Sequence, residues 1–306
     1  MSIHKVCING DVNELITLLE IGCDINQKNN SDESPIHLVC RHNHINLLKI
    51  LLEQRNPSVN ITGLTKYGWS PLYTASRYGN HGCVNLLLPY LNENDINSIA
   101  NTENGLGRTS LFIACHWKAY KVVHALLQAN ADVNKCTING RTPLFTVASN
   151  GKYSIVKLLL SQNNILVNKS DNFGDIPLTI ACRNGKNEIT KLLLNAKSDI
   201  FHKNNDGKTP LEEAMKHDNS LIVKMIHQHP WFRRRNLIMI KSKENSNDNS
   251  NYHQEKHLSD LLSATPSSGS SSNSGSSGNS SSSSSSSTND TAELMFELKK
   301  LVASYL

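Results

Sequence analysis

Histidine and cysteine stand together twice at a spacing that suits metal binding. His4 and Cys7 lie three positions apart, and His37 and Cys40 repeat this spacing. Residues three apart share one face of a helix, and imidazole with thiolate is a ligand combination that binds zinc. The two pairs are therefore the first candidates for a metal or redox site.

Catalytic motifs are absent from the sequence. It has no glycine-rich phosphate loop, no nucleophile elbow and no His-Glu-x-x-His. Carboxylates such as Asp24, Asp132 and Asp199 recur in front of a hydrophobic residue at comparable loop positions, and acidic side chains at such places are typical of turns. We predict a protein that is not an enzyme and needs no cofactor.

Composition excludes several classes of protein. The chain has 306 residues, 7 cysteines and a formal net charge of +5. Few cysteines argue against a disulfide-rich secreted scaffold, and the mild charge does not by itself indicate nucleic-acid binding. Residues 1–5 lack the basic and apolar regions of a signal peptide, and no window of about 20 residues is apolar throughout. We expect a soluble protein of a reducing compartment, cytoplasmic or, as the alternative, nuclear.

A sequence frame returns at a nearly constant interval, and this frame must position any site. Ile3-His-Lys-Val-Cys7 matches Ile36-His-Leu-Val-Cys40 after 33 residues. The start of the frame then recurs at Ser34, Ser70, Thr109, Thr142, Ile176 and Thr209. A period of this length indicates stacked structural repeats.

Each part of the frame has a physical meaning. Ser or Thr before Pro is a helix N-cap, and the missing N–H of Pro costs nothing in the first turn. A Gly about nine residues later, such as Gly79 or Gly151, can take the left-handed conformation that ends a short helix. An apolar second helix follows, as in residues 155–160, and a Gly turn such as Tyr67-Gly68 precedes the cap. One unit cannot bury its apolar face alone, whereas a stack can.

These residues resemble the ankyrin repeat, whose signature is Thr-Pro-Leu-His followed by a helix, a Gly turn, a second helix and a protruding β-turn finger. The resemblance covers about residues 3–227 and implies an all-α ankyrin-repeat solenoid. The predicted array is 1–228, with repeats at about 1–28, 31–60, 67–97, 106–135, 139–169, 173–202 and 206–228.

Three repeats depart from the signature. Repeat one lacks a finger and a cap, as a terminal repeat would. Repeat three has a long connection at 90–103, and Pro89 is expected to end its second helix early. In repeat seven Asp218 replaces the Gly of the turn, and Glu212 replaces the signature His.

The repeat frame gives the cysteines a structural explanation. Cys7, Cys40, Cys115 and Cys182 occupy the same frame position, at which the small residues Ser76 and Ala148 stand in other repeats. This pattern predicts a small buried slot, where free cysteine is common. The resemblance implies that equivalent positions lie about 10 Å apart, too far for a disulfide, and that His4 and His37 hydrogen-bond to backbone. We therefore predict no metal site, against the alternative of zinc at the His–Cys pairs.

Large aromatic and basic residues gather where an ankyrin protein binds its partners. In that family the fingers and the exposed ends of the first helices line a concave groove, and these positions should not face the packing between repeats. Trp, Tyr and Arg dominate binding hot spots. The predicted partner-binding residues, centred on repeats three and four, are Tyr67, Trp69, Arg77, Tyr78, Arg108, His116, Trp117, Arg141, Phe173 and Arg183. The alternative is that finger aromatics only shield neighbouring backbone.

The same groove is predicted to be basic. Arg41 and Lys208 extend the row of arginines, against which stand Glu33, Asp175 and Asp206. An acidic protein segment would be attracted to such a surface. Nucleic acid is the weaker alternative, because the arginines are spread singly over the repeats instead of forming a continuous stripe.

The repeat pattern ends after repeat seven, and three segments of other kinds are predicted to follow. Residues 229–242 are predicted to form a capping helix in which Trp231 and Phe232 cover the end of the array. Residues 243–290 are predicted to be a disordered linker with a serine-rich tract at 266–287. Residues 291–306 have the apolar spacing of a short amphipathic helix.

The expected function is that of a scaffold or adaptor that binds a protein partner through the groove and does not enter a membrane. A regulatory inhibitor that masks an enzyme or a transcription factor is one alternative. A nucleic-acid-associated factor that uses the basic groove is the other.

Overall fold

The structure is a computed structural model that describes residues 2–54, 58–98 and 106–233. Helices in these ranges form seven consecutive pairs, and we number the repeats by them. The first helices are α1 (Ile3–Asn9), α3 (Pro35–His42), α5 (Pro71–Arg77), α8 (Ser110–His116), α10 (Pro143–Asn150), α12 (Pro177–Arg183) and α14 (Pro210–Lys216). The second helices are α2 (Val12–Glu20), α4 (Ile45–Glu53), α6 (His81–Leu87), α9 (Tyr120–Gln128), α11 (Tyr153–Leu160), α13 (Asn187–Asn195) and α15 (Ser220–Gln228).

The predicted caps begin the first helices. The hydroxyls of Ser70, Thr109 and Thr142 accept hydrogen bonds from the backbone N–H three residues on, which satisfies one of the donors that a helix start leaves free. In repeat seven Thr209 and Glu212 form a reciprocal capping box. The loss of the signature His therefore leaves this helix start intact.

The turn after each first helix needs a left-handed residue, but that residue is not always glycine. Gly79 and Gly151 have φ values of 73° and 78°, as their sequence position predicts. Asn43, Lys118 and Asp218 fill the equivalent position with φ values of 61°, 62° and 56°. Packing on both sides thus holds three non-glycine residues in a conformation that L-residues rarely adopt.

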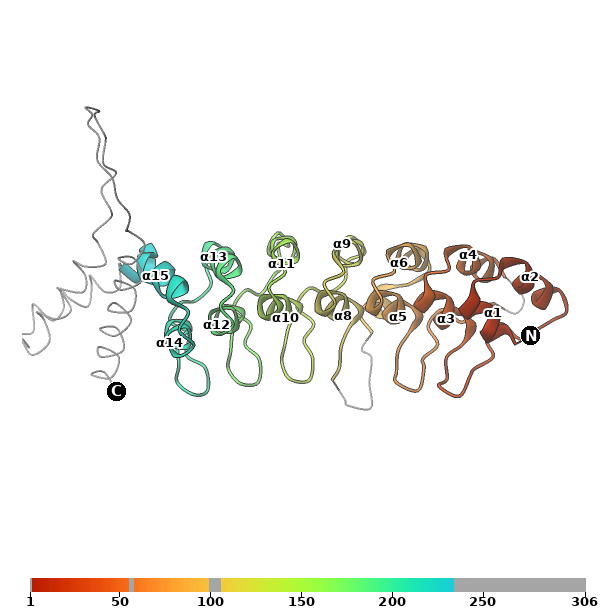
Figure 1. The fold of residues 1–306 in the computed structure, drawn as a ribbon, viewed down its shortest axis with the longest axis horizontal. Coiled ribbons are helices and arrows are strands. Elements are labelled where there is room, and N and C mark those ends of the chain that lie inside the picture. The colour runs from red at the N-terminus through yellow and green to blue at the C-terminus, as the bar shows by residue number, and fades with distance from the viewer. Residues whose placement is uncertain (1, 55–57, 99–105, 234–306) are drawn as a thin grey trace, which may run out of the picture.

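The helix pairs stack into an elongated solenoid. Figure 1 shows the first helices in one row, the second helices in a parallel row, and the loops between repeats extending from the first row away from the second. One continuous core runs through the stack, in which Leu48, Leu159 and Ile222 of repeats two, five and seven are fully buried. Each repeat covers the apolar face of its neighbour, and the predicted all-α solenoid is confirmed.

The finger loops are joined to one another by backbone hydrogen bonds. The N–H of Lys66 donates to the carbonyl oxygen of Ser31 at 3.1 Å, and that of Asn172 donates to Asn139 at 3.0 Å. Gly140, in the finger of repeat five, has a φ of 74°, and a Cβ there would lie 2.7 Å from the Asn172 side chain. Glycine therefore lets neighbouring fingers approach each other closely.

Repeat three and the C-terminal end carry the irregular features. In repeat three α6 ends at Leu87, a 3₁₀ turn at Leu88–Tyr90 contains Pro89, and the short helix α7 (Glu93–Ile96) follows.

Repeat one was expected to lack a cap, but it has one, because the Ser2 side chain accepts from the N–H of Lys5 at 3.4 Å.

At the other end of the array the Phe232 ring stacks on Phe201 with centroids 6.0 Å apart and meets the His227 ring at 4.8 Å. Trp231, in contrast, is 54% exposed. The expected helix at 229–242 lies outside the described residues beyond Arg233, as do the expected linker and the amphipathic helix at 291–306. Within the described ranges no helix is both long and apolar enough to cross a bilayer.

Candidate protein-binding surface

Arg77 joins two repeats through the rings of two tryptophans. Its guanidinium carbon lies 4.9 Å from the ring centroid of Trp69, in the finger of repeat three, and 5.4 Å from that of Trp117, at the end of α8. The His116 ring meets the Trp117 ring edge-on at 5.3 Å. We call Trp69, Arg77, His116 and Trp117 the Arg77 cluster.

The two tryptophans of the Arg77 cluster differ in exposure. Trp69 is half-buried and packs on Tyr73 of its own repeat and on Ile113 of repeat four. The expectation that finger aromatics stay clear of the packing between repeats is therefore wrong for Trp69. Trp117 is 53% exposed, so it presents a large apolar surface to solvent beside a cation.

Several arginines of the predicted basic groove form ion pairs. Arg41 pairs with Glu33, and Arg141 pairs with Asp171 at 3.3 Å. Arg183 bonds Asp175 at 2.6 Å and the buried carboxylate of Glu213 at 2.9 Å. The sequence pattern set Glu33 and Asp175 against the arginines, but it did not identify Asp171 and Glu213 as counter-charges.

The predicted arginines without an ion pair to a described carboxylate therefore lie in the middle of the array. Of the predicted arginines, Arg77 and Arg108 have no ion pair with any described carboxylate. The pKa of His116 is lowered by burial first and then by the charges of Arg108 and Arg77. His116 is therefore uncharged at neutral pH and adjoins a positive region.

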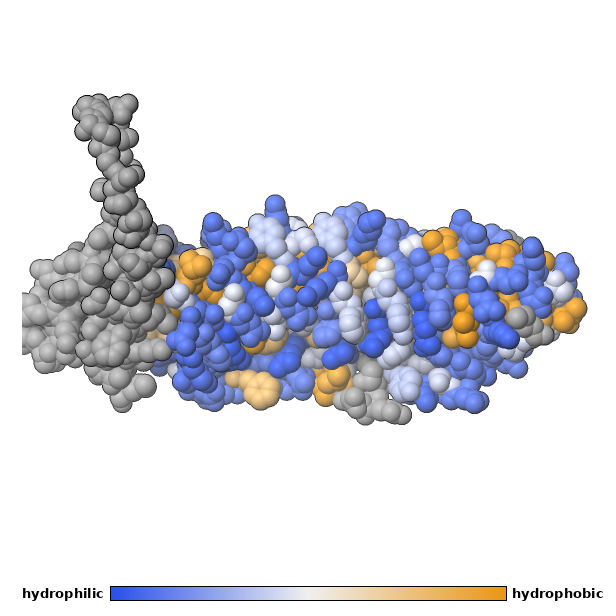
Figure 2. All heavy atoms as spheres, in the orientation of Figure 1, coloured by the Kyte–Doolittle hydropathy of each residue, from blue (hydrophilic) through white to orange (hydrophobic). Residues whose placement is uncertain are grey.

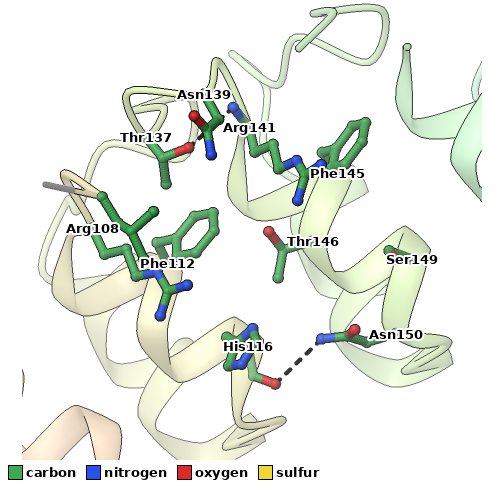
Figure 3. A pocket seen from close by; sticks show the side chains of 11 residues that line it. Arg108, Phe112, His116, Thr137, Asn139, Arg141, Phe145, Thr146, Ser149 and Asn150 are labelled. Atoms are coloured by element: carbon green, nitrogen blue, oxygen red, sulfur yellow. Dashed lines mark hydrogen bonds between the residues drawn. The ribbon is translucent and has the colours of Figure 1, made fainter. Parts of the chain in front are cut away.

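A cavity opens next to the Arg77 cluster, between the first helices of repeats four and five. Its volume is about 140 Å³, and its walls include Arg108, Phe112, His116, Arg141 and Phe145 (Figure 3). The guanidinium carbon of Arg108 lies 5.8 Å from the Phe112 centroid, and that of Arg141 lies 5.3 Å from the Phe145 centroid.

The sequence interpretation missed both phenylalanines. Their signal was present, because repeats four and five share the spacing Arg-Thr-x-x-Phe at 108–112 and 141–145. Stacking on a ring fixes the plane of a guanidinium and leaves its N–H groups free at the edge.

Among the other predicted residues, Tyr67 contacts the Arg77 cluster, whereas Tyr78 and Phe173 have other surroundings. The Tyr78 ring lies under Arg41, 5.7 Å from its guanidinium carbon, while Tyr67 rests against Trp69 at 5.4 Å. Phe173 is 62% exposed in the finger of repeat six, and Ile138 is 60% exposed in the finger of repeat five. Figure 2 shows a mainly hydrophilic face with small hydrophobic patches at the finger ends.

The candidate metal ligands have other partners. His37 Nε2 lies 3.0 Å from two backbone carbonyl oxygens, those of Gly63 and Trp69, and His4 Nε2 lies 2.9 Å from that of Gln27. All seven cysteines are unpaired, and Cys7 and Cys40 are buried. Within the described ranges no three His, Cys, Asp or Glu side chains are grouped to hold a metal ion.

Comparison with known proteins decides the family. The family model described as Ankyrin repeats (3 copies) matches residues 3–100, 90–171 and 147–230. The chain belongs to the ankyrin repeat family. Ankyrin repeats are in general non-catalytic modules of protein–protein interaction, which agrees with a surface built from exposed aromatic and basic side chains.

Similar proteins agree on the fold of this ankyrin chain. The human ASB11 ankyrin repeat domain superposes with a TM-score of 0.61 at 24% identity, over 70% of this chain and 91% of that one. The tyrosine-protein kinase HTK16 of Hydra vulgaris is 29% identical over 29% of this chain and 12% of its own length. The human SMC5-SMC6 complex localization factor protein 1 is 36% identical over 29% of this chain and 8% of its own length. The matched segments thus span only a small part of these two relatives.

Proposed function

We propose that this ankyrin repeat protein is a scaffold or adaptor that binds a protein partner through the Arg77 cluster and the neighbouring cavity. One observation carries the proposal: Trp117 leaves more than half of its side chain exposed while it holds Arg77 on its ring. A fold that only needed to pack would not leave its largest side chain exposed beside a cation without an ion pair. Trp and Arg are the side chains whose burial contributes most to protein interfaces.

An acidic segment is the partner chemistry that this surface favours. Arg77 and Arg108 offer charge that no described carboxylate neutralises, whereas Arg41 and Arg183 are already paired. Acidic residues would be attracted to Arg77 and Arg108 in the middle of the array. The same pairing counts against the nucleic-acid alternative, because a phosphate backbone is bound by a row of free cations.

Recovery of partners from cells in which the protein is native tests the proposal. The full chain, Trp117→Ala and Trp231→Ala are compared as baits, with bound proteins quantified by mass spectrometry. Trp231 is the matched control, since its exposure of 54% equals that of Trp117 within a per cent and it lies at the far end of the array. We expect a partner that Trp117→Ala loses and Trp231→Ala keeps. A set of bound proteins that is the same for all three baits contradicts the proposal.

A further inference from the structure

Two positions of the repeat frame set the charge of the groove. One directly precedes the N-cap of the first helix, and the other lies eight residues later, near the end of that helix. In repeats two and six the first position holds a carboxylate, Glu33 or Asp175, and the second holds an arginine, Arg41 or Arg183. Each arginine bonds the carboxylate of its own repeat. In each of these two repeats the carboxylate therefore neutralises the charge of the arginine.

Repeats four and five reverse this arrangement. Their first position holds an arginine, Arg108 or Arg141, and their second holds His116 or Ser149, neither of which carries charge at neutral pH. Each arginine stacks on the phenylalanine four residues later instead of bonding a carboxylate of its own repeat. Unlike repeats two and six, repeats four and five therefore have no described carboxylate of their own that pairs with the arginine.

The cavity lies where the missing group would sit. Arg108 and Arg141 line it from neighbouring repeats, and none of its lining residues is acidic. Figure 3 shows Thr146 between the two arginine–phenylalanine pairs. Arg108 Nε is buried without a hydrogen-bond partner, which leaves a charged donor unsatisfied in the unbound protein.

We propose that this cavity binds a single carboxylate side chain, a Glu or Asp of the partner's acidic segment, between Arg108 and Arg141. The inference rests on the proposed function, because the carboxylate belongs to the same partner. Each guanidinium lies over a ring, and the planar fork of its N–H groups suits two parallel bonds to a carboxylate. The Thr146 hydroxyl and the neutral His116 ring add donors without adding charge.

Charge balance favours a carboxylate over a phosphate. The lining contributes two positive charges, and Asp171, bonded to Arg141 at Nε, already offsets one of them. A carboxylate neutralises the charge that remains. A phosphate group carries about −1.5 to −2 charges at neutral pH and would leave an excess of negative charge beside Asp171.

NMR titration of the full chain tests the carboxylate site directly. The side-chain Nε–H resonances of Arg108 and Arg141 and the backbone amide of Thr146 report binding of N-acetyl-glutamate methylamide. The neutral control is the glutamine analogue, and the phosphate arm is the phosphoserine analogue. We expect a saturable response to the glutamate probe, at least about tenfold weaker binding of the glutamine analogue because a charge-assisted bond is lost, and no tighter binding of the phosphoserine analogue.

Variants assign the response to the cavity. Arg108→Gln should abolish saturation at Arg141 and Thr146. Lys121→Gln removes the same charge from the exposed side of α9 in the same repeat and should leave binding unchanged. The glutamate probe binds without the partner, so that failure of this site and failure of partner recovery are told apart.

Three results would overturn the carboxylate site. One is a linear response of the wild-type protein up to about 100 mM, a range in which any contact is very weak. The others are equal binding of the glutamate and glutamine analogues, and binding of the phosphoserine analogue that is tighter by tenfold or more.

Discussion

The Nε2–H of His37 donates to the backbone carbonyl oxygen of Trp69 at 3.0 Å, so repeat two holds the finger that carries Trp69 of the Arg77 cluster. The same nitrogen lies 3.0 Å from the carbonyl oxygen of Gly63, and Nδ1 accepts from the N–H of Ser34 at 3.3 Å and lies 2.9 Å from the Ser34 hydroxyl. This hydrogen-bond pattern assigns the proton to Nε2 and makes the ring neutral. A second proton, on Nδ1, would face the Ser34 N–H and break that bond.

The stability of the array should therefore decrease in mild acid. Burial lowers the pKa of His37 from 6.5 to about 4, so the unfolded chain takes up the proton first. The free energy of unfolding should fall as the pH drops from 6.5 toward 4 and level off below, by about 3 kcal/mol from this residue. Burial lowers the pKa of His227 as well, which adds to the same trend.

Urea melts at several pH values, compared with those of His37→Gln, isolate the contribution of His37. The difference in stability between the two proteins should shrink as the pH falls through this window, because glutamine does not titrate. A difference that stays constant from pH 7 to pH 4 would show that His37 is not held neutral.

The core of repeat five should be sensitive to the loss of a single side chain. Leu159 of α11 is fully buried, so Leu159→Ala should cost about 2–5 kcal/mol of unfolding free energy in a denaturant melt. Because repeats are coupled only to their neighbours, the loss is also expected to separate unfolding into two transitions. Leu166→Ala, at an exposed leucine, is the control and should stay within about 0.5 kcal/mol. Equal effects of the two substitutions would contradict the packing of this repeat.

The fold was predictable because its determinants are local and recur. The caps at Ser70 and Thr142 and the turn at Gly79 are short-range signals, and each follows from the sequence of one repeat. Lys118 is different. Nothing in its sequence requires a φ of 62°, and the conformation is imposed by the helices that pack on both sides of the turn.

The surface was predictable only in part, because much of it is built across repeats. Residue type identified Arg77 and Trp117, but their contact depends on how repeat four is rotated on repeat three. The bond between Arg141 and Asp171 likewise joins a helix start to the next finger. The bond between Glu33 and Arg41 lies within one repeat at a fixed spacing, and that signal was available in the sequence.

Thiol reactivity should divide the cysteines into two groups. Burial raises the pKa of Cys7 and Cys182 to about 12 and raises that of Cys115 as well, so these thiols carry almost no thiolate at neutral pH. Titration with a chromogenic disulfide should modify the two partly exposed cysteines, Cys23 and Cys136, rapidly in the native protein. All seven should react after denaturation. Stoichiometric zinc in the purified protein that is lost on Cys40→Ser would support a metal site instead.

Arg183 should contribute to stability and not to partner binding. Removing its side chain leaves Asp175 and Glu213 buried without their counter-charge, and Arg183→Ala should cost about 2 kcal/mol or more of unfolding free energy. Arg77 bonds no described carboxylate and lies between the half-buried ring of Trp69 and the exposed ring of Trp117, so Arg77→Ala should cost about 1 kcal/mol or less. Paired denaturant melts measure both values. A larger loss for Arg77→Ala would mean that the Arg77 cluster is primarily structural.

The two tryptophans of the Arg77 cluster should separate binding from folding. Trp117 is mostly exposed, so Trp117→Ala should weaken binding of a recovered partner by at least about 2 kcal/mol and change stability by no more than about 0.5 kcal/mol. Trp69 packs between repeats three and four, and Trp69→Ala should lower the unfolding free energy by more than about 1 kcal/mol. Calorimetry with the purified partner measures the affinity of each variant, and denaturant melts measure its free energy of unfolding. If Trp117→Ala unfolds repeat four, its ring is structural; if it alters neither stability nor affinity, the partner binds elsewhere on the array.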